Sequence, residues 1–89
     1  MNMQIRQVSV TNPRGLHARV AARIVLLASR FKCRVALAFN GRTADARNII
    51  AVMLLAAGAG SAVRIETSGA DEREALEALS ALISSKHVL

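Results

Sequence analysis

The sequence predicts an α+β domain, an open-faced sandwich with the element order β-α-β-β-α-β-α, in which a four-stranded antiparallel sheet carries three helices on one face. Three observations lead to this fold class. The chain has 89 residues, enough for one core and too few for two, so residues 1–89 are expected to form a single domain. Stretches of alternating apolar and polar residues are interleaved with stretches of helical periodicity. Between two alternating stretches, Asn40-Gly41 favours a tight antiparallel turn.

Val8-Ser9-Val10 alternates between apolar and polar side chains and, together with residues 3–6, predicts a first strand near residues 4–10. A cluster of turn-forming residues at 11–15 ends it. Helical spacing then predicts a helix over residues 17–30, with an arginine-bearing face beside an apolar stripe. The stripe consists of Val20, Ile24, Leu27 and Phe31.

Residues 33–39 alternate again and predict a half-buried second strand. The turn at Asn40-Gly41 reverses the chain, because both of these residues tolerate the positive φ that a type I′ turn requires. The third strand is therefore expected to be short, over residues 42–45.

Residues 48–55 are apolar nearly all round, which predicts a short helix packed into the core. Residues 61–67 form the last strand, with alternate side chains pointing inward. The final helix begins near Asp71, where acidic residues in the first turn complement the helix dipole. Its expected buried stripe is Leu76, Leu79, Leu82 and Ile83.

Ten Arg and two Lys stand against two Asp and four Glu, a net charge of +6 that favours an anionic partner. A nucleic acid, a membrane surface, a phosphate group and an acidic protein all fit this charge. The absence of Trp and Tyr argues against sites built by stacking on aromatic rings. One cysteine, Cys33, permits no internal disulfide and gives a metal site little to build on, so no metal is expected.

The longest uncharged run, residues 48–63, is shorter than the roughly 20 apolar residues of a spanning helix and contains two glycines. The first residues lack the apolar region of a targeting signal. We therefore expect a cytoplasmic protein without membrane insertion.

Gly15-Leu16-His17-Ala18-Arg19 is the segment with the clearest chemistry, because a glycine turn delivers His17 to the start of a helix. A helix N-terminus offers unpaired N–H groups to an anion. Its positive end and the flanking Arg14 and Arg19 disfavour a charged imidazole, which leaves a nucleophilic nitrogen near neutral pH. Gly15, Ala18 and Arg14 would then cradle a phosphoryl group. A histidine that only caps the helix or faces solvent fits the local chemistry equally well.

The run from Gly15 to Ala22 resembles the active-site signature of HPr, the histidine-containing phosphocarrier family of the bacterial phosphoenolpyruvate-dependent phosphotransferase system. Residues 47–60 resemble the second helix of that family and the loop after it, and residues 69–76 resemble the start of its third helix. The resemblance extends from residue 4 to about residue 85 in matching order, and the family fold agrees with the predicted element order.

The resemblance implies that His17 takes a phosphoryl group on Nδ1 from phosphorylated enzyme I and passes it to an EIIA-type protein, while Arg19 orients the group. It implies a monomeric carrier without a cofactor, which is consumed and regenerated rather than acting as an enzyme. It also implies a docking surface for both partners. Its residues are Leu16, Val20, Arg23, Arg47, Asn48, Ile49, Met53 and Leu54.

Two positions depart from the family pattern. Val20 stands where proline is usual, and proline suits the first turn of a helix because it lacks an N–H. Asn48 stands where many members have a phosphorylatable serine, and Arg47 replaces the usual lysine. Asparagine has no hydroxyl, so regulation through this position is not expected.

Two other functions remain open at this point. One is a small basic nucleic-acid-binding domain, against which the missing aromatics, the few lysines and the lack of a binding motif all argue. The other is an HPr-like regulatory protein that binds partners without transferring phosphate.

Overall fold

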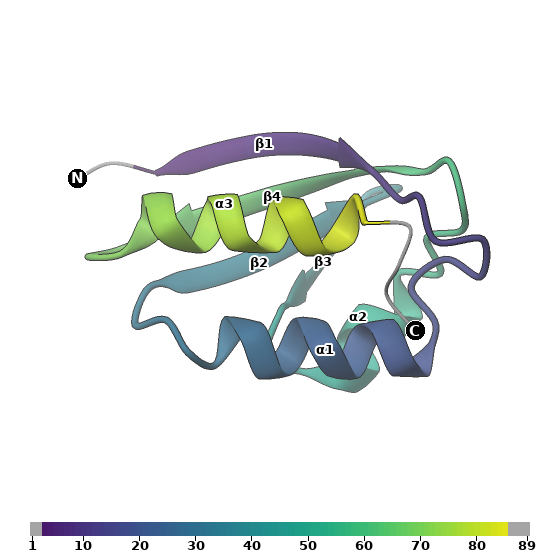
Figure 1. Ribbon diagram of the computed structural model, residues 1–89, viewed down its shortest axis with the longest axis horizontal. Helices are drawn as coiled ribbons and strands as arrows, with labels where there is room; N and C mark the ends of the chain where they lie inside the picture. The colour runs from purple at the N-terminus through teal and green to yellow at the C-terminus, as the bar shows by residue number, and fades with distance from the viewer. Residues whose placement is uncertain (1–2, 86–89) are drawn as a thin grey trace.

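The computed structural model describes residues 3–85, and its seven elements follow one another in the predicted order (Figure 1). The strands are β1 (Gln4–Ser9), β2 (Arg34–Phe39), β3 (Arg42–Asp45) and β4 (Ala62–Ser68). The helices are α1 (Ala18–Ala28), α2 (Ile49–Leu54) and α3 (Glu72–Ile83). The predicted elements are confirmed, with boundaries that differ by a residue or two.

The sheet is antiparallel throughout, and its strand order is β1-β4-β2-β3. The hairpin between β2 and β3 turns at Asn40 and Gly41, whose φ angles are 53° and 78°, as the type I′ turn requires. The pairing of Ser9 with Ala62 places the end of β1 beside the start of β4. The loops that follow β1 and precede β4 therefore lie at the same end of the sheet (Figure 1).

The three helices pack on one face of the sheet, with α3 against β1 and β4, α2 against β3, and α1 in contact with both other helices (Figure 1). The core between the layers is aliphatic, because inward side chains of the strands meet the apolar stripes of the helices. Within residues 3–85 no helix covers the other face, so the sandwich is open as predicted. Its largest fully buried side chains include Ile24, Leu37, Ile65, Leu79 and Ile83.

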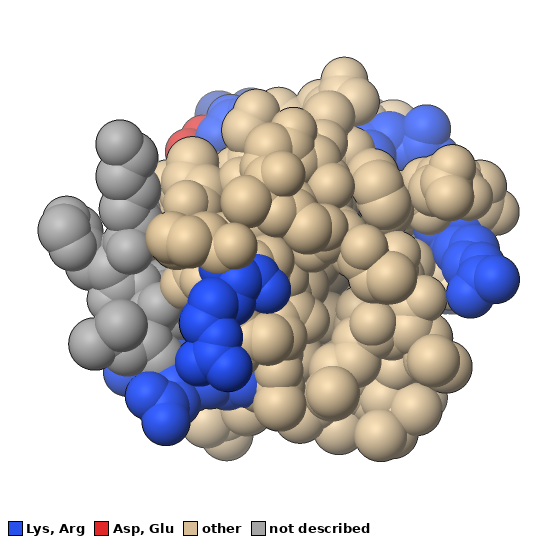
Figure 2. All heavy atoms as spheres, turned by 90° about the vertical axis from the view of Figure 1, so that its right-hand side faces the viewer, with Lys and Arg blue, Asp and Glu red and all other residues tan. Residues whose placement is uncertain are grey.

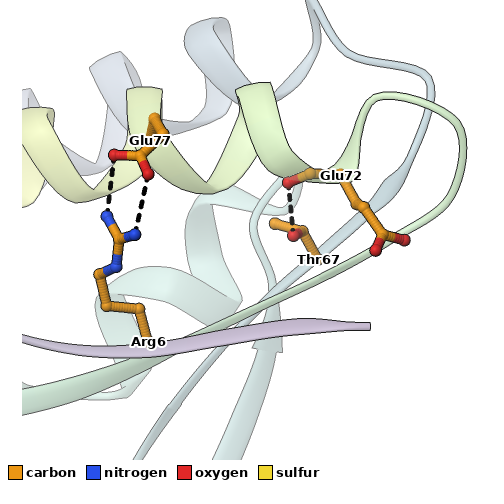
Figure 3. A network of polar contacts seen from close by, with 4 residues as sticks. All are labelled: Arg6, Thr67, Glu72 and Glu77. Carbon is orange, nitrogen blue, oxygen red and sulfur yellow. Dashed lines mark hydrogen bonds and ion pairs between the residues drawn. The ribbon is translucent and has the colours of Figure 1, made fainter. Parts of the chain in front are cut away.

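Polar contacts fasten α3 to the two strands beneath it (Figure 3). The guanidinium of Arg6 donates to both carboxylate oxygens of Glu77, at 2.9 and 2.8 Å. The hydroxyl of Thr67 donates to the backbone carbonyl of Glu72 at 2.7 Å, and the Glu72 carboxylate accepts from the Gly69 N–H at 3.0 Å. Because Arg6 hydrogen-bonds the ionised carboxylate, it holds the pKa of Glu77 below its usual range.

Residues 31–33, which connect α1 to β2, are held from two sides. The Arg47 guanidinium donates to the carbonyls of Phe31 and Cys33 at 2.6 and 2.9 Å. The Asp71 carboxylate accepts from the N–H groups of Lys32 and Cys33, both at 2.9 Å. Asp71 was expected in the first turn of the last helix; it is the N-cap residue, and its side chain is directed to this connection instead.

Two helices differ in detail from what the sequence predicts. Helix α1 ends at Ala28, two residues early, because the N–H groups of Arg30 and Phe31 bond three residues back, which tightens the last turn. Helix α2 packs against the core as expected, through buried Val52 and half-buried Ile49 and Ala51, but its other three residues are exposed although all six are apolar.

Candidate functional site

A tight turn at residues 12–15 brings the chain from β1 to the start of α1. Asn12 organises it, since its backbone carbonyl accepts from the Gly15 N–H at 2.9 Å and its side-chain Oδ1 accepts from the Arg14 N–H at 2.9 Å. Pro13 fixes the φ angle between them. Asn12 is buried, and the sequence reasoning did not single it out; the Asn-Pro pair was the available signal.

His17 is the N-cap residue of α1, with an extended backbone at φ −73° and ψ 177°. Its Nδ1 accepts from the Arg19 N–H at a long 3.4 Å, so this nitrogen faces the N–H groups of the first turn. Those N–H groups have no intrahelical acceptors. An anionic group bonded to Nδ1 would therefore lie against the positive end of α1. The His17 side chain is half-buried, which leaves part of the ring accessible.

Three residues predicted at the surface of the site lie beneath it. Gly15 is buried and its N–H already donates to Asn12, so it cannot belong to a phosphate cradle. Leu16 and Val20, predicted to dock partners, are 5% and 2% exposed and belong to the hydrophobic core. The prediction for these three residues is wrong, because the turn and the inner face of α1 support His17 from below. Ala18, by contrast, is exposed in the first turn.

Arginines surround the start of α1. Arg14, Arg19 and Arg23 are all exposed, the first in the turn before His17 and the other two on the outer face of the helix. Figure 2 shows this end of the molecule, where Lys and Arg form separate groups and Asp and Glu are visible only at one margin. Most of the remaining described surface in this view belongs to uncharged residues, so basic side chains outnumber acidic ones there (Figure 2).

Helix α2 ends beside His17, because the Leu16 N–H donates to the carbonyl of Ala57 in the loop that follows this helix. Of the predicted docking residues, Met53 and Leu54 are exposed, while Ile49 is half-buried and packs against the core. Ile50 is 61% exposed and was missed. Its signal was present in the sequence, since an apolar helix of six residues cannot bury every side chain.

Arg47 and Asn48 lie at the opposite end of α2, next to the connection after α1. The loop that follows α2, and not this end of the helix, makes the hydrogen bond to the residue before His17. The Arg47 guanidinium binds two backbone carbonyls, which gives it a structural role, and its part in docking partners stays a prediction. Asn48 is exposed and caps α2, since its Oδ1 accepts from the Ala51 N–H at 3.1 Å.

Cys33 is buried at the start of β2, and burial raises the pKa of its thiol to about 11. It is therefore a protonated, small apolar side chain near neutral pH. Between residues 3 and 85, no three His, Cys, Asp or Glu side chains gather in a group that could hold a metal ion. None of the helices in that range is long and apolar enough to cross a bilayer.

The fold and the site together define a class of small open-faced sandwich that presents a histidine at the N-terminus of its first helix. The sequence profile of the family described as "PTS HPr component phosphorylation site" matches residues 5–85. The chain therefore belongs to the HPr family of phosphocarrier proteins of the phosphotransferase system.

Individual relatives agree with this assignment. The phosphocarrier protein HPr of Cupriavidus necator is 48% identical over 81 residues, which cover 91% of each chain. The crystal structure of a phosphocarrier protein HPr from Bacillus anthracis superimposes with a TM-score of 0.90 at 41% identity and covers 93% of this chain and 99% of its own. An HPr dimer from Thermoanaerobacter tengcongensis gives a TM-score of 0.71 at 36% identity, covering 85% and 87%.

Proposed function

We propose that Nδ1 of His17 accepts a phosphoryl group from phosphorylated enzyme I and transfers it to an EIIA-type protein. One observation carries the proposal: Nδ1 faces the N–H groups at the start of α1, in a chain that matches the phosphocarrier family over residues 5–85. In the first transfer, the Nδ1 lone pair attacks phosphorus while the bond between phosphorus and the donor breaks. The second transfer repeats this step with Nδ1 as the leaving group.

The residues around His17 would stabilise the phosphoryl oxygens. The N–H groups of Ala18 and Arg19 lie in the first turn of α1, where the helix dipole favours negative charge. The exposed side chains of Arg14 and Arg19 make no hydrogen bond or ion pair with the described residues, so they are available to an anion. Phosphoryl transfer depends mainly on positioning and charge stabilisation, which these groups supply without a metal ion of the carrier's own.

The surface beside His17 fits partners that combine apolar and acidic groups. Ile50, Met53 and Leu54 expose apolar side chains on α2, and Arg19 and Arg23 lie on the outer face of α1. A partner would bury the apolar residues at the centre of the interface, while its acidic groups meet the arginines around them. The protein would act in the cytoplasm as a monomeric carrier, used stoichiometrically by enzyme I and the EIIA-type protein.

Incubation with enzyme I, Mg²⁺ and phosphoenolpyruvate, followed by intact-mass measurement, tests the proposal. One phosphoryl group should be added, and the modification should be labile in acid and stable in alkali, as a phosphoramidate is. His17→Ala should abolish it without loss of the fold, because the side chain makes a single long hydrogen bond. His87→Ala, which removes the other histidine of the chain, should retain the modification.

Modification that persists in His17→Ala, or that survives acid, would contradict the assignment. A chain that binds enzyme I but is never modified would instead support the regulatory function that the sequence left open.

A further inference from the structure

Two loops that are far apart in the sequence meet directly behind His17. The Leu16 N–H donates to the Ala57 carbonyl at 3.0 Å, and both residues are buried, at 5% and 2% exposure. Leu16 immediately precedes His17 in the chain, so this hydrogen bond ties the backbone of the histidine turn to the loop between α2 and β4.

Gly15 brings the same two backbones into contact. Its φ angle is +68°, and a Cβ atom at this position would lie 2.6 Å from the Ala57 carbonyl oxygen and 2.8 Å from the Gly58 Cα. Both neighbours are backbone atoms, which cannot swing aside as the end of a long side chain can. The histidine turn therefore packs directly against the backbone of residues 57–58, which leaves no space for a side chain at position 15.

The loop itself has an unusual backbone at Ala56, where φ is +56°. This left-handed conformation is unfavourable for an L-residue with a Cβ atom. Ala56 directly follows Leu55, the C-cap residue of α2, at the position where a left-handed residue commonly ends a helix. It turns the chain out of the helix, and the next carbonyl, that of Ala57, points to the Leu16 N–H instead of along the helix axis.

We propose that Ala57 is a positioning residue for His17, and that the left-handed backbone of Ala56 aims the Ala57 carbonyl at the histidine turn. The inference rests on the proposed phosphoryl transfer at His17. Within residues 3–85 the His17 ring has one long hydrogen bond of its own, so the location of Nδ1 depends on how firmly the backbone before it is held. A displacement of about 1 Å at a reacting group is enough to slow a reaction by about a hundredfold.

Gly15→Ala tests the contact, and Gly41→Ala is its matched control. Both substitutions place a Cβ on a glycine with positive φ, +68° and +78°, but no atom lies within 4 Å of the added carbon at Gly41. In Gly15→Ala we expect turnover of phosphoryl transfer from phosphorylated enzyme I to fall about ten- to a hundredfold. The KM for the carrier should change less than about twofold, because the docking side chains are untouched. Gly41→Ala should keep both parameters.

Nuclear magnetic resonance supplies a measurement that does not depend on phosphoryl transfer. In Gly15→Ala the Leu16 amide should exchange rapidly with solvent and the ring resonances of His17 should shift, and in Gly41→Ala neither should change. If the wild-type protein is never phosphorylated, the proposed function fails, while these resonances still decide whether Ala57 positions His17. Retained protection of the Leu16 amide in Gly15→Ala, or unchanged turnover after that protection is lost, would overturn the proposal.

A pair of variants at the exposed Ala56 covers the case in which Gly15→Ala does not fold. Ala56→Val introduces a β-branched side chain, which strongly disfavours positive φ, and Ala56→Gly accepts it freely. We expect Ala56→Val to slow transfer and expose the Leu16 amide, and Ala56→Gly to match the wild-type protein in both. Equal transfer rates in the two variants, with the Leu16 amide exposed only in Ala56→Val, would contradict the proposal.

Discussion

At the scale of single residues, His17 is held through its backbone and not through its ring. Its carbonyl accepts from the Ala21 N–H at 2.8 Å, and the preceding residue is tied to Ala57. Among the residues that the structure describes, the ring has only the 3.4 Å contact with the Arg19 N–H. In the proposed transfer His17 offers the same nitrogen to two partners in turn, and a ring with one weak hydrogen bond among the described residues costs little to release from its resting contact.

Arg19 is expected to steady the phosphoryl group, since its side chain is exposed at the first turn of α1 and has no partner among the described residues. Arg19→Ala should slow transfer about ten- to a hundredfold, the loss expected for one charge-assisted hydrogen bond in the transition state. Rapid-quench kinetics with phosphorylated enzyme I measures this effect. Arg30→Ala, beyond the other end of α1, should affect only the rate of association and its dependence on salt. Transfer at the wild-type rate in Arg19→Ala would show that backbone N–H groups alone hold the group.

At the scale of elements, the connection of residues 31–33, between the end of α1 and the start of β2, is tied to the residues that precede α2 and α3. Arg47 contributes donors to it and Asp71 contributes acceptors. These two charged side chains hydrogen-bond two N–H groups and two carbonyls of the short connection, which would otherwise lack partners within the protein. This arrangement explains why Arg47 is half-buried, while most other arginines of the chain are exposed.

Arg47→Ala should destabilise the fold by about 1.5–3 kcal/mol, since hydrogen bonds from a charged donor to two carbonyls are lost. The corresponding fall in Tm is about 4–8 °C per kcal/mol for a domain of this size. The matched control is Arg34→Ala, an exposed arginine without a partner among the described residues, which should stay within about 0.5 kcal/mol.

Thermal denaturation of both arginine variants, of Asp71→Ala and of the double variant Arg47→Ala/Asp71→Ala gives the comparison. The loss of stability in the double variant should be smaller than the sum of the two single losses, because each substitution releases the same connection. Strict additivity would mean that Arg47 and Asp71 act on independent parts of the structure.

At the scale of the whole molecule, the contacts of the acidic residues explain how charge is distributed between the interior contacts and the surface. Five of the six make hydrogen bonds or ion pairs inside the protein, and only Glu74 makes none with the described residues. The five are Asp45, Glu66, Asp71, Glu72 and Glu77. These five carboxylates are therefore engaged in contacts within the protein, and most arginines are left on the surface without an opposite charge. This distribution leaves the net charge of +6 available to acidic partners.

The polar contacts of the carboxylates of Asp71, Glu72 and Glu77 predict how the stability of the fold depends on pH. The pKa values of Asp71, Glu72 and Glu77 are lowered, the first two mainly by backbone N–H donors and the third mainly by Arg6. Because the folded protein binds protons at these groups less readily than the unfolded chain, their contribution is complete above about pH 5 and is lost as the pH falls through the lowered values. Tm should therefore drop steeply between about pH 5 and pH 2.

Glu77→Gln should flatten this acid limb, since the amide does not titrate, and Glu74→Gln should leave it unchanged. Calorimetry from about pH 2 to pH 8 on the three proteins measures the difference. An identical pH profile for wild type and Glu77→Gln would show that the contact with Arg6 does not contribute to acid stability.

The sequence by itself determined every element of the fold, because each depends on patterns a few residues long. The alternation around Val63 and Ile65, the Asn40-Gly41 turn and the spacing of Leu76 and Leu79 all correspond to the observed burial and turn geometry. The family assignment confirms the resemblance to HPr, and the phosphorylation of His17 that the resemblance implies stays a prediction.

Only the tertiary structure decided which residues near His17 face outward. Leu16, Val20 and Gly15 are next to the histidine in the chain and yet buried, because the turn is seated on residues 57–58. Arg47 became a structural residue through contacts 14 and 16 residues away, and Asp71 through contacts 38 and 39 residues away. Such contacts depend on how the helices and strands pack against each other, which a local pattern of polarity does not specify.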